Sequence, residues 1–237
     1  MIFVTGDLHG SNDIGKINPR SKFRRTYKDL TKKDYLIICG DFGVIWRAAP
    51  DDEEKRLLNY LTNECPWTTL FIDGNHENFE RLKQYKVSTW KGGKIQKITD
   101  SVYHLLRGEI FKIENKTFFT FGGGKSYDQD MRTPYVSWWP DEIPNYEEFK
   151  NGFENLLKHK KTVDYFITHT CSREVMNLFI KKKVFYDIWE DSTFTTIGSL
   201  ADFATIKKHW FFGHFHKDVQ LDEKITCLYN KVIKLDD

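Results

Sequence analysis

Residues 2–10 read IFVTGDLHG, a short apolar run that ends in a glycine and is followed by an aspartate and a histidine one residue apart. Continuous runs of β-branched and aromatic residues are typical of strands that are buried on both faces of a sheet. In extended backbone, residues i and i+2 point to the same side, so Asp7 and His9 can hold one metal ion as a pair. Gly6 lets the chain turn sharply before them. This segment predicts a buried strand whose carboxyl end carries metal-ligating side chains.

The same pattern recurs along the chain and predicts an α/β fold. Apolar runs that end in a glycine or a polar cluster occupy residues 2–6, 35–40, 69–74, 164–169 and 209–214. Charged segments with helical spacing lie between them, at residues 22–33, 51–64, 77–85, 145–160 and 195–208. Strands that alternate with helices in this way are typical of α/β proteins.

Two further segments alternate apolar and polar residues and predict antiparallel hairpins. One is GEIFKIENKTFFTFGG (108–123), with alternating runs on both sides of Asn115, and the other is KITCLYNKVIKL (224–235). Parallel and antiparallel pairs together indicate either one mixed sheet or two sheets packed face to face with helices outside. The sequence shows no repeat, low-complexity tract or linker, so we expect a single domain over residues 1–237.

The composition disfavours several classes of protein. Lys and Arg number 36 and Asp and Glu 34, and the resulting charge of +2 is too balanced to indicate a nucleic-acid or membrane partner. The four cysteines form no CxxC pair, so we expect reduced thiols and neither a zinc knuckle nor a disulfide framework. The N-terminus lacks a signal-peptide pattern, and no segment reaches the roughly 18 apolar residues of a membrane span. We therefore expect a soluble, cytoplasmic protein without membrane contact, and the oligomeric state stays open.

Metal-capable side chains follow all five predicted strands. Open α/β sheets place their sites beyond the carboxyl ends of the strands, so these residues can converge although they are far apart in sequence. A mixture of oxygen and imidazole ligands suits Mn, Fe, Zn, Co or Ni. Seven ligands are too many for one tetrahedral ion but fit two ions that share a carboxylate, for which Asp41 is the natural candidate. The candidate ligands are Asp7, His9, Asp41, Asn75, His169, His214 and His216.

This set of ligands predicts a substrate class and a proton donor. Two divalent ions with two ligating carboxylates leave a cationic site, which favours an anionic substrate such as a phosphate ester. Ions about 4 Å apart can hold a hydroxide for in-line attack and neutralise the phosphoryl oxygens. The departing oxygen then needs a proton. His76 is the candidate donor, because it follows Asn75 and is expected to project away from the ion that Asn75 would bind.

Five motifs resemble, in their order and spacing, those of the calcineurin-like metallophosphoesterase superfamily: GDLHG (6–10), GDFG (40–43), GNHE (74–77), TH (168–169) and GHFH (213–216). The resemblance implies a four-layer α/β/β/α sandwich, with two mixed sheets between the helices. It also implies two divalent metal ions, with Mn²⁺ the first choice among Mn, Fe, Zn, Ni and Co. It matches His76 to the proton donor and Asp41 to the bridge between the metals. The first metal would bind Asp7, His9 and His216, and the second Asn75, His169 and His214.

The residues after the bridging aspartate depart from one branch of this superfamily. Protein serine/threonine phosphatases and related dinucleotide hydrolases carry an acidic residue or its equivalent, and then an arginine, at this point. Here Val44, Ile45 and Trp46 follow GDFG. The departure disfavours a phosphoprotein phosphatase.

Residues 122–144 resemble an insert of a bacterial and phage-related branch of unassigned substrate, and we expect them to form one wall of the cleft. Arg132 and Lys125 are candidates to bind phosphate oxygens, and Trp138 or Trp139 to stack on a base or sugar. A nucleotide P-loop at GGGKS (122–126) is disfavoured, because that pattern needs a glycine at position 119.

The leading hypothesis is a metal-dependent phosphoesterase that hydrolyses a phosphomonoester or a phosphodiester. A catalytically silent scaffold with the same fold is the rival, and the complete ligand set favours the enzyme. A nuclease or a cyclic-nucleotide diesterase competes with a monoesterase, because all use the same chemistry, so a small-molecule and a nucleic-acid substrate both stay open. Glu77 is expected to stabilise the helix that follows it, and Asp73 either to orient His76 or to lie exposed in a turn.

Overall fold

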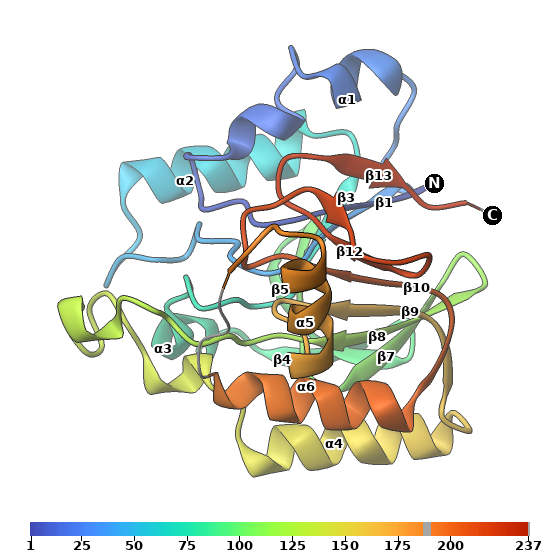
Figure 1. Ribbon diagram of the computed structural model, residues 1–237. Coiled ribbons are helices and arrows are strands. Elements are labelled where there is room, and N and C mark those ends of the chain that lie inside the picture. The colour runs from blue at the N-terminus through green and yellow to red at the C-terminus, as the bar shows by residue number, and fades with distance from the viewer. Residues whose placement is uncertain (187–190, 237) are drawn as a thin grey trace.

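The computed structural model describes residues 1–186 and 191–236 and contains two β-sheets between two layers of helices (Figure 1). The strand order of the first sheet is β13 (Val232–Lys234), β1 (Ile2–Thr5), β2 (Tyr35–Ile38), β3 (Thr68–Phe71), β6 (Val102–Leu105), β5 (Gly93–Thr99) and β4 (Val87–Trp90). The order of the second is β11 (Val219–Gln220), β12 (Ile225–Cys227), β10 (Thr205–Phe212), β9 (Thr162–Thr168), β8 (Lys116–Phe121) and β7 (Glu109–Ile113).

Alternate side chains of the central strands face two different cores. Ile2 and Val4 of β1 lie in a buried cluster with Phe118 and Ile167 of the second sheet, so the two sheets pack face to face. Phe3, between them in sequence, points the other way and joins a cluster on the outer face of the first sheet. All four residues of β1 are buried and the first three are apolar, as predicted for a strand that is covered on both faces.

Helices cover both outer faces and complete the four layers. The first sheet is covered by α1 (Lys22–Thr26), α2 (Asp52–Asn59) and α3 (Phe79–Leu82), and the second by α4 (Tyr146–Lys158), α5 (Arg173–Lys181) and α6 (Ser192–Phe203). Figure 1 shows α1 and α2 on one side of the strands and α4 and α6 on the other. The α/β/β/α sandwich expected from the resemblance is confirmed.

Most predicted strands are found, and one of the two predicted hairpins is confirmed. The five predicted buried strands are β1, β2, β3, β9 and β10. In the hairpin of β7 and β8, Glu114 and Asn115 occupy the turn with φ angles of 50° and 63°. Positive φ at both turn residues matches the right-handed twist of the flanking strands.

The predicted hairpin at 224–235 is wrong. β12 pairs in parallel with β10 in the second sheet, whereas β13 pairs antiparallel with β1 in the first sheet. The chain between them therefore crosses from one sheet to the other, and it passes over Gly6, where an added Cβ would lie 2.0 Å from the carbonyl oxygen of Leu228.

Several boundaries also differ from the prediction. The helix predicted at 195–208 ends at Phe203, and residues 205–208 belong to β10 instead. Of the helix predicted at 22–33, only Lys22–Thr26 is helical, as α1. Helix α5 and the strands β4 to β6 were not predicted. Exposed residues interrupt the apolar pattern of β4 and β5.

No described helix is long and apolar enough to cross a membrane. All four cysteines are buried free thiols, as expected.

Candidate metal centre

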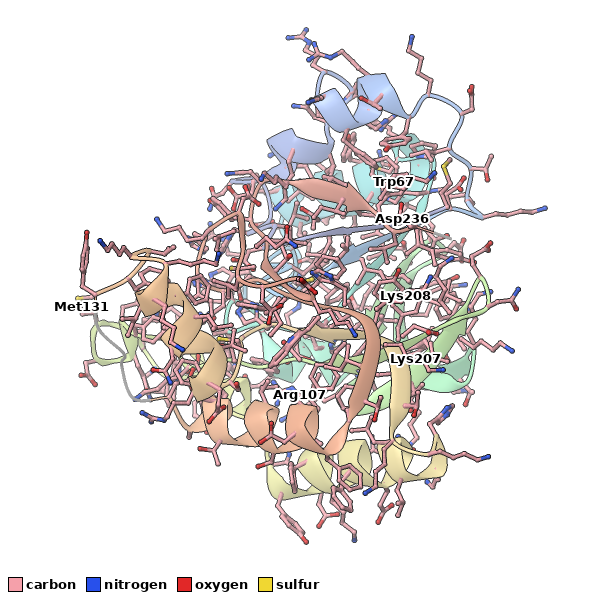
Figure 2. The ribbon with its side chains drawn as sticks, turned by 45° about the vertical axis from the view of Figure 1, so that its right-hand side comes forward. Trp67, Arg107, Met131, Lys207, Lys208 and Asp236 are labelled. Carbon is pink, nitrogen blue, oxygen red and sulfur yellow. The ribbon has the colours of Figure 1, made fainter. Side chains whose placement is uncertain are left out.

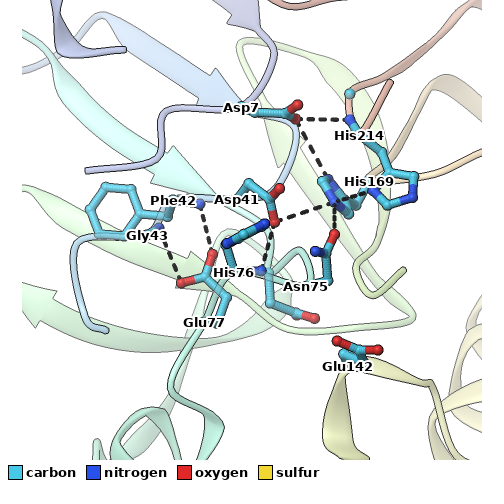
Figure 3. Close-up of polar contacts among 12 residues, drawn as sticks. Asp7, Asp41, Phe42, Gly43, Asn75, His76, Glu77, Glu142, His169 and His214 are labelled. Carbon is cyan, nitrogen blue, oxygen red and sulfur yellow. Dashed lines mark hydrogen bonds and ion pairs between the residues drawn. The ribbon is translucent and has the colours of Figure 1, made fainter. Parts of the chain in front are cut away.

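Side chains that follow the parallel strands meet at one edge of the two sheets and form two overlapping groups. Figure 3 shows five of these side chains together: Asp7, Asp41, Asn75, His169 and His214. Within each group the potential ligand atoms lie within 4.8 Å of one another. The first group consists of Asp7, His9, Asp41 and His216, and the second of Asp41, His169 and His214. The side-chain oxygen of Asn75 lies 3.1 Å from Nε2 of His169 and so belongs beside the second group. The structure thus brings all seven candidate ligands together, with Asp41 common to both groups.

The ring of His169 is oriented by the backbone so that one nitrogen faces the other candidate ligands. Its Nδ1 lies 2.9 Å from the carbonyl oxygen of Cys39, which can only accept, so Nδ1 carries the hydrogen. Nε2 is then the lone-pair atom, and it lies 3.3 Å from Oδ1 of Asp41 and 3.1 Å from Nδ1 of His214. A histidine held in this way has its ligating nitrogen free toward a metal.

Two other histidines are held in the same manner. Nδ1 of His9 donates to Oδ2 of Asp13 at 2.8 Å, which leaves its Nε2 facing Oδ2 of Asp41 at 3.1 Å. Nε2 of His214 lies 2.8 Å from the hydroxyl of Tyr127, and a hydrogen bond donated to that phenol oxygen leaves Nδ1 as the lone-pair atom. Each outer nitrogen is therefore bonded to protein and each inner nitrogen faces Asp41 or its neighbours.

Asp7 shows directly that the site fits a cation. Its Oδ1 accepts from the backbone N–H of His214 at 2.9 Å, whereas the buried Oδ2 has no hydrogen-bond partner among the described residues. Burial raises the pKa of Asp7 to about 6, and the charge of Asp41 adds to the rise, while His169 opposes it. This oxygen lies 3.4 Å from Nε2 of His216, and a buried carboxylate oxygen without a hydrogen bond, beside a second carboxylate, is stabilised by a cation.

Four of the candidate ligands adopt left-handed backbone conformations. The φ angles are 46° for His9, 46° for Asp41, 67° for His214 and 49° for His216. Such conformations are uncommon outside glycine and are found preferentially at functional sites. The extended-backbone argument for the pairing of Asp7 and His9 is therefore wrong, although the two side chains do share a group.

Glycines before the ligands allow main chains to approach closely, as predicted. A Cβ added at Gly74 would lie 2.0 Å from Oδ1 of Asp41, and one added at Gly213 would lie 2.0 Å from Oδ1 of Asp7. Any side chain at these positions would displace the carboxylates.

Comparison with known proteins assigns the chain to a family. Residues 1–218 match the family model of calcineurin-like phosphoesterases. The chain belongs to the calcineurin-like phosphoesterase family. Membership places it among hydrolases that act on phosphoester bonds, and the family and the two groups of ligands together indicate divalent metal ions.

Two curated relatives of this calcineurin-like phosphoesterase carry the name lariat debranching enzyme. The protein from Danio rerio is 24% identical over 91% of the chain, and lariat debranching enzyme A from Xenopus laevis is 25% identical over 91%. The chain covers 40% and 42% of their respective lengths, which is less than half of each relative. No solved structure matches the chain.

His76 lies at the border of the first group in this phosphoesterase. Its ring centroid is 5.0 Å from that of His9 and 5.5 Å from that of Trp46, and its backbone N–H donates to Oδ1 of Asp41 at 2.8 Å. Burial lowers the pKa of His76, partly offset by the charge of Asp41. Nη2 of Arg132 lies 3.4 Å from Nε2 of His76, so an arginine of the 122–144 segment stands next to the candidate proton donor.

The 122–144 segment lies along the site. A Cβ added at Gly124 would lie 3.0 Å from Cδ2 of His169, and the hydroxyl of Ser126 lies 3.2 Å from the side-chain nitrogen of Asn75. The buried carboxylate of Glu142 accepts from this hydroxyl at 2.7 Å and from the backbone N–H of Ser126 at 2.8 Å. Met131, near the middle of the segment, is 85% exposed and projects from the molecule in Figure 2.

The aromatic and basic candidates in this segment differ in accessibility. Trp139 is fully buried, with its ring centroid 5.2 Å from that of Trp46. The prediction that Trp139 can stack on a substrate is therefore wrong. Trp138 and Lys125 are half-buried. Arg132 is held by Oδ1 of Asp128 at 2.6 Å and by the carbonyl oxygen of Ser137.

Glu77, the last residue of the GNHE motif, has another role than predicted. Glu77 does not stabilise the helix after it; its carboxylate accepts from the backbone N–H groups of Phe42 and Gly43, at 2.7 and 3.3 Å, and so supports the loop that carries Asp41 (Figure 3). Asn78 caps α3 in its place.

Asp73 neither orients His76 nor lies exposed. Its buried carboxylate lies 3.1 Å from Nε2 of His104 and accepts from Nε of Arg107 at 2.8 Å. Arg107 also binds Glu148 at 2.9 Å, so the loop before Asn75 is tied to α4. Neither Arg107 nor Glu148 belongs to a motif, and only their contacts identify this role.

Proposed function

We propose that this protein is a phosphoesterase that uses two divalent metal ions, bound by the two groups that share Asp41. The observation that carries the proposal is the orientation of His9, His169 and His214. Each of these rings is hydrogen-bonded through its outer nitrogen and directs its inner nitrogen toward the shared carboxylate or its neighbours. Oδ2 of Asp7, which is buried without a hydrogen bond among the described residues, supports the same interpretation.

Each ion would be bound by the residues of one of the two groups. Asp7, His9 and His216 would hold one ion, Asn75, His169 and His214 the other, and Asp41 both. When bound, such ions supply Lewis-acid activation of water and neutralise phosphoryl charge. Mn²⁺ is the metal that we would supply first, since mixed imidazole and oxygen ligands suit it.

The remaining steps fall to side chains at the edge of the centre. His76, half-buried beside His9, would give its proton to the departing oxygen. Arg132, held rigidly by Asp128 and next to His76, would bind a phosphoryl oxygen, as a fixed guanidinium is suited to do. We propose that residues 122–144 thus form one wall of the cleft, within a single domain.

A phosphodiester is the substrate that we would test first. Both curated relatives are named lariat debranching enzymes and are 24% and 25% identical to this chain. A phosphomonoester and a silent scaffold are the alternatives. The full set of ligands together with His76 favours an enzyme over a scaffold, because each position serves a chemical purpose that a scaffold would not need.

The test uses purified protein with Mn²⁺ and two chromogenic substrates, 4-nitrophenyl phosphate and bis(4-nitrophenyl) phosphate. We expect turnover of the diester, about two metal ions per chain by elemental analysis, and loss of both in Asp41→Asn. Asp100→Asn is the matched control, because this side chain is 92% exposed and remote from the groups of ligands. Bound metal without turnover of either ester would favour the scaffold.

Two further variants test the side chains at the edge of the centre. Arg132→Ala is expected to raise KM with metal content unchanged, and an unchanged KM would exclude direct substrate binding. His76→Asn is expected to slow esters with poor leaving groups most, because these depend on the proton. Equal slowing of good and poor leaving groups would exclude the role of proton donor.

A further inference from the structure

A cavity of about 280 Å³ opens beside the first group of ligands. His9 and His76 line it on the side of the metal centre, and Trp46 and residues at the start of α2 line it as well. Residues of three different loops line the cavity, whereas no residue of the 122–144 segment does.

We infer that this cavity binds the alcohol that leaves during hydrolysis, and that it selects an uncharged, ring-bearing alcohol over one that carries a further anionic group. The inference rests on the proposed function and specifies the substrate class of that site.

The position of His76 determines which part of a substrate enters the cavity. A general acid must lie within hydrogen-bond reach of the oxygen that it protonates. Because His76 borders both the metal centre and the cavity, an alcohol whose oxygen meets His76 extends its remaining atoms into the cavity. The phosphoryl group stays on the side of the metal ligands.

Trp46 gives the cavity a flat and rigid wall. Its ring is half-buried, lies 5.5 Å from the ring of His76 with an interplanar angle of 32°, and is packed edge-on against the fully buried Trp139 at 5.2 Å. Since Trp139 holds the indole in place, a ring can stack on its free area with little loss of side-chain entropy. Stacking of this kind is tolerant of the identity of the ring.

The α2 side of the cavity carries carboxylates, and one of them, Glu53, forms no ion pair with any described residue. Glu54 forms an ion pair with Arg81, with 2.6 Å between Oε1 and Nη2. Asp51 is paired with Arg47 at 3.4 Å. Glu53, in contrast, accepts a hydrogen bond from the neutral hydroxyl of Ser11.

A phosphate or carboxylate on the leaving alcohol would therefore face the charge of Glu53. An uncharged alcohol meets no such repulsion and can hydrogen-bond to the polar side chains of the rim, such as Ser11 and Asn12. The cavity is thus suited to an alcohol such as a nucleoside or another neutral ring compound.

The test compares two diesters that share one retained group. Phenyl 4-nitrophenyl phosphate and phenyl 3-carboxy-4-nitrophenyl phosphate both release their nitrophenol, and only the second leaving group bears a carboxylate. The quantity measured is the ratio of kcat/KM for the neutral over the charged leaving group. Comparing this ratio between variants cancels the intrinsic difference between the two nitrophenols.

Glu53→Gln is expected to lower this ratio about fivefold, because it removes the facing charge. Asp52→Asn is the matched control: it changes the net charge equally within the same helical turn, but its side chain is 90% exposed and does not line the cavity. Trp46→Ala is expected to raise KM for the neutral diester about tenfold, and Trp46→Phe to restore most of the loss.

Two results would overturn the inference while leaving the proposed function intact. One is an equal change of the ratio in Glu53→Gln and Asp52→Asn. The other is an unaltered KM in Trp46→Ala.

Failure of the proposed function looks different, because neither diester would then be hydrolysed by the Mn²⁺-loaded protein. In that case saturation-transfer NMR with phenol tests whether the cavity binds a ring, independently of hydrolysis. Binding that is lost in Trp46→Ala supports the cavity as a ring-binding site, and absence of binding to the wild type refutes it.

Discussion

Gly74→Ala tests whether the metal centre depends on close contact between two loops. An alanine Cβ at this position would lie 2.0 Å from Oδ1 and 2.3 Å from the backbone nitrogen of Asp41. Real Cβ contacts below 3.0 Å are essentially never found, so the loops must separate by about 1 Å. The backbone nitrogen cannot rotate away as a long side chain would, and the displacement therefore falls on the shared carboxylate.

The expected cost of Gly74→Ala has two parts. Overpacking of this kind destabilises proteins by about 1–3 kcal/mol, and for a chain of this length each kcal/mol lowers Tm by roughly 2–4 °C. A misplacement of about 1 Å at a catalytic centre lowers the rate about 100-fold. We therefore expect a folded protein with a modestly lowered Tm and a severe loss of kcat/KM and of bound Mn²⁺.

The assay combines hydrolysis of bis(4-nitrophenyl) phosphate, elemental analysis of bound metal and thermal unfolding. Gly15→Ala is the matched control, because its added Cβ would have its nearest neighbour, Nδ2 of Asn18, at 4.0 Å. If Gly74→Ala matched Gly15→Ala in activity and metal content, the argument from close backbone approach would be refuted. If activity fell only by the fraction of protein that is unfolded, a specific effect of the substitution on Asp41 would be refuted.

Three other perturbations have clear expected outcomes. Tyr127→Phe removes the phenol that holds His214 and should weaken Mn²⁺ binding about tenfold in calorimetric titration, and unchanged affinity would exclude this role. Arg107→Leu removes the guanidinium from the buried carboxylate of Asp73, which then keeps only its contact with His104, and should cost about 3–5 kcal/mol in urea unfolding; a cost below about 1 kcal/mol would contradict the argument. Burial lowers the pKa of His209 below its ordinary 6.5, so the unfolded state binds the proton first. Its contribution to stability is complete above about pH 6.5 and falls as the pH decreases, and His209→Gln should flatten this part of the urea stability profile.

The sequence by itself determined the fold class and the seven candidate ligands. Each buried strand is a short apolar run that ends in a glycine or a polar cluster and carries a metal-capable residue, and this local pattern is visible without knowledge of the partners. The convergence of Asp7 and Asp41 follows from the parallel order of β1 and β2, because parallel strands end at the same edge of a sheet. His169 follows β9 of the second sheet, and only the packing of the two sheets brings it to them. The hairpin at Asn115 was also predictable, since its alternation and turn are local.

Tertiary structure alone decided how the ligands are supported and which strands pair. Residues 224–235 have the alternation of a hairpin, but β12 and β13 pair with different sheets, because pairing depends on which edges are left open by the rest of the chain. The partners of the histidines, such as Tyr127, come from segments without a motif. A hydrogen bond between residues far apart in sequence leaves no periodic signal, since it requires only that two side chains meet once the core has packed.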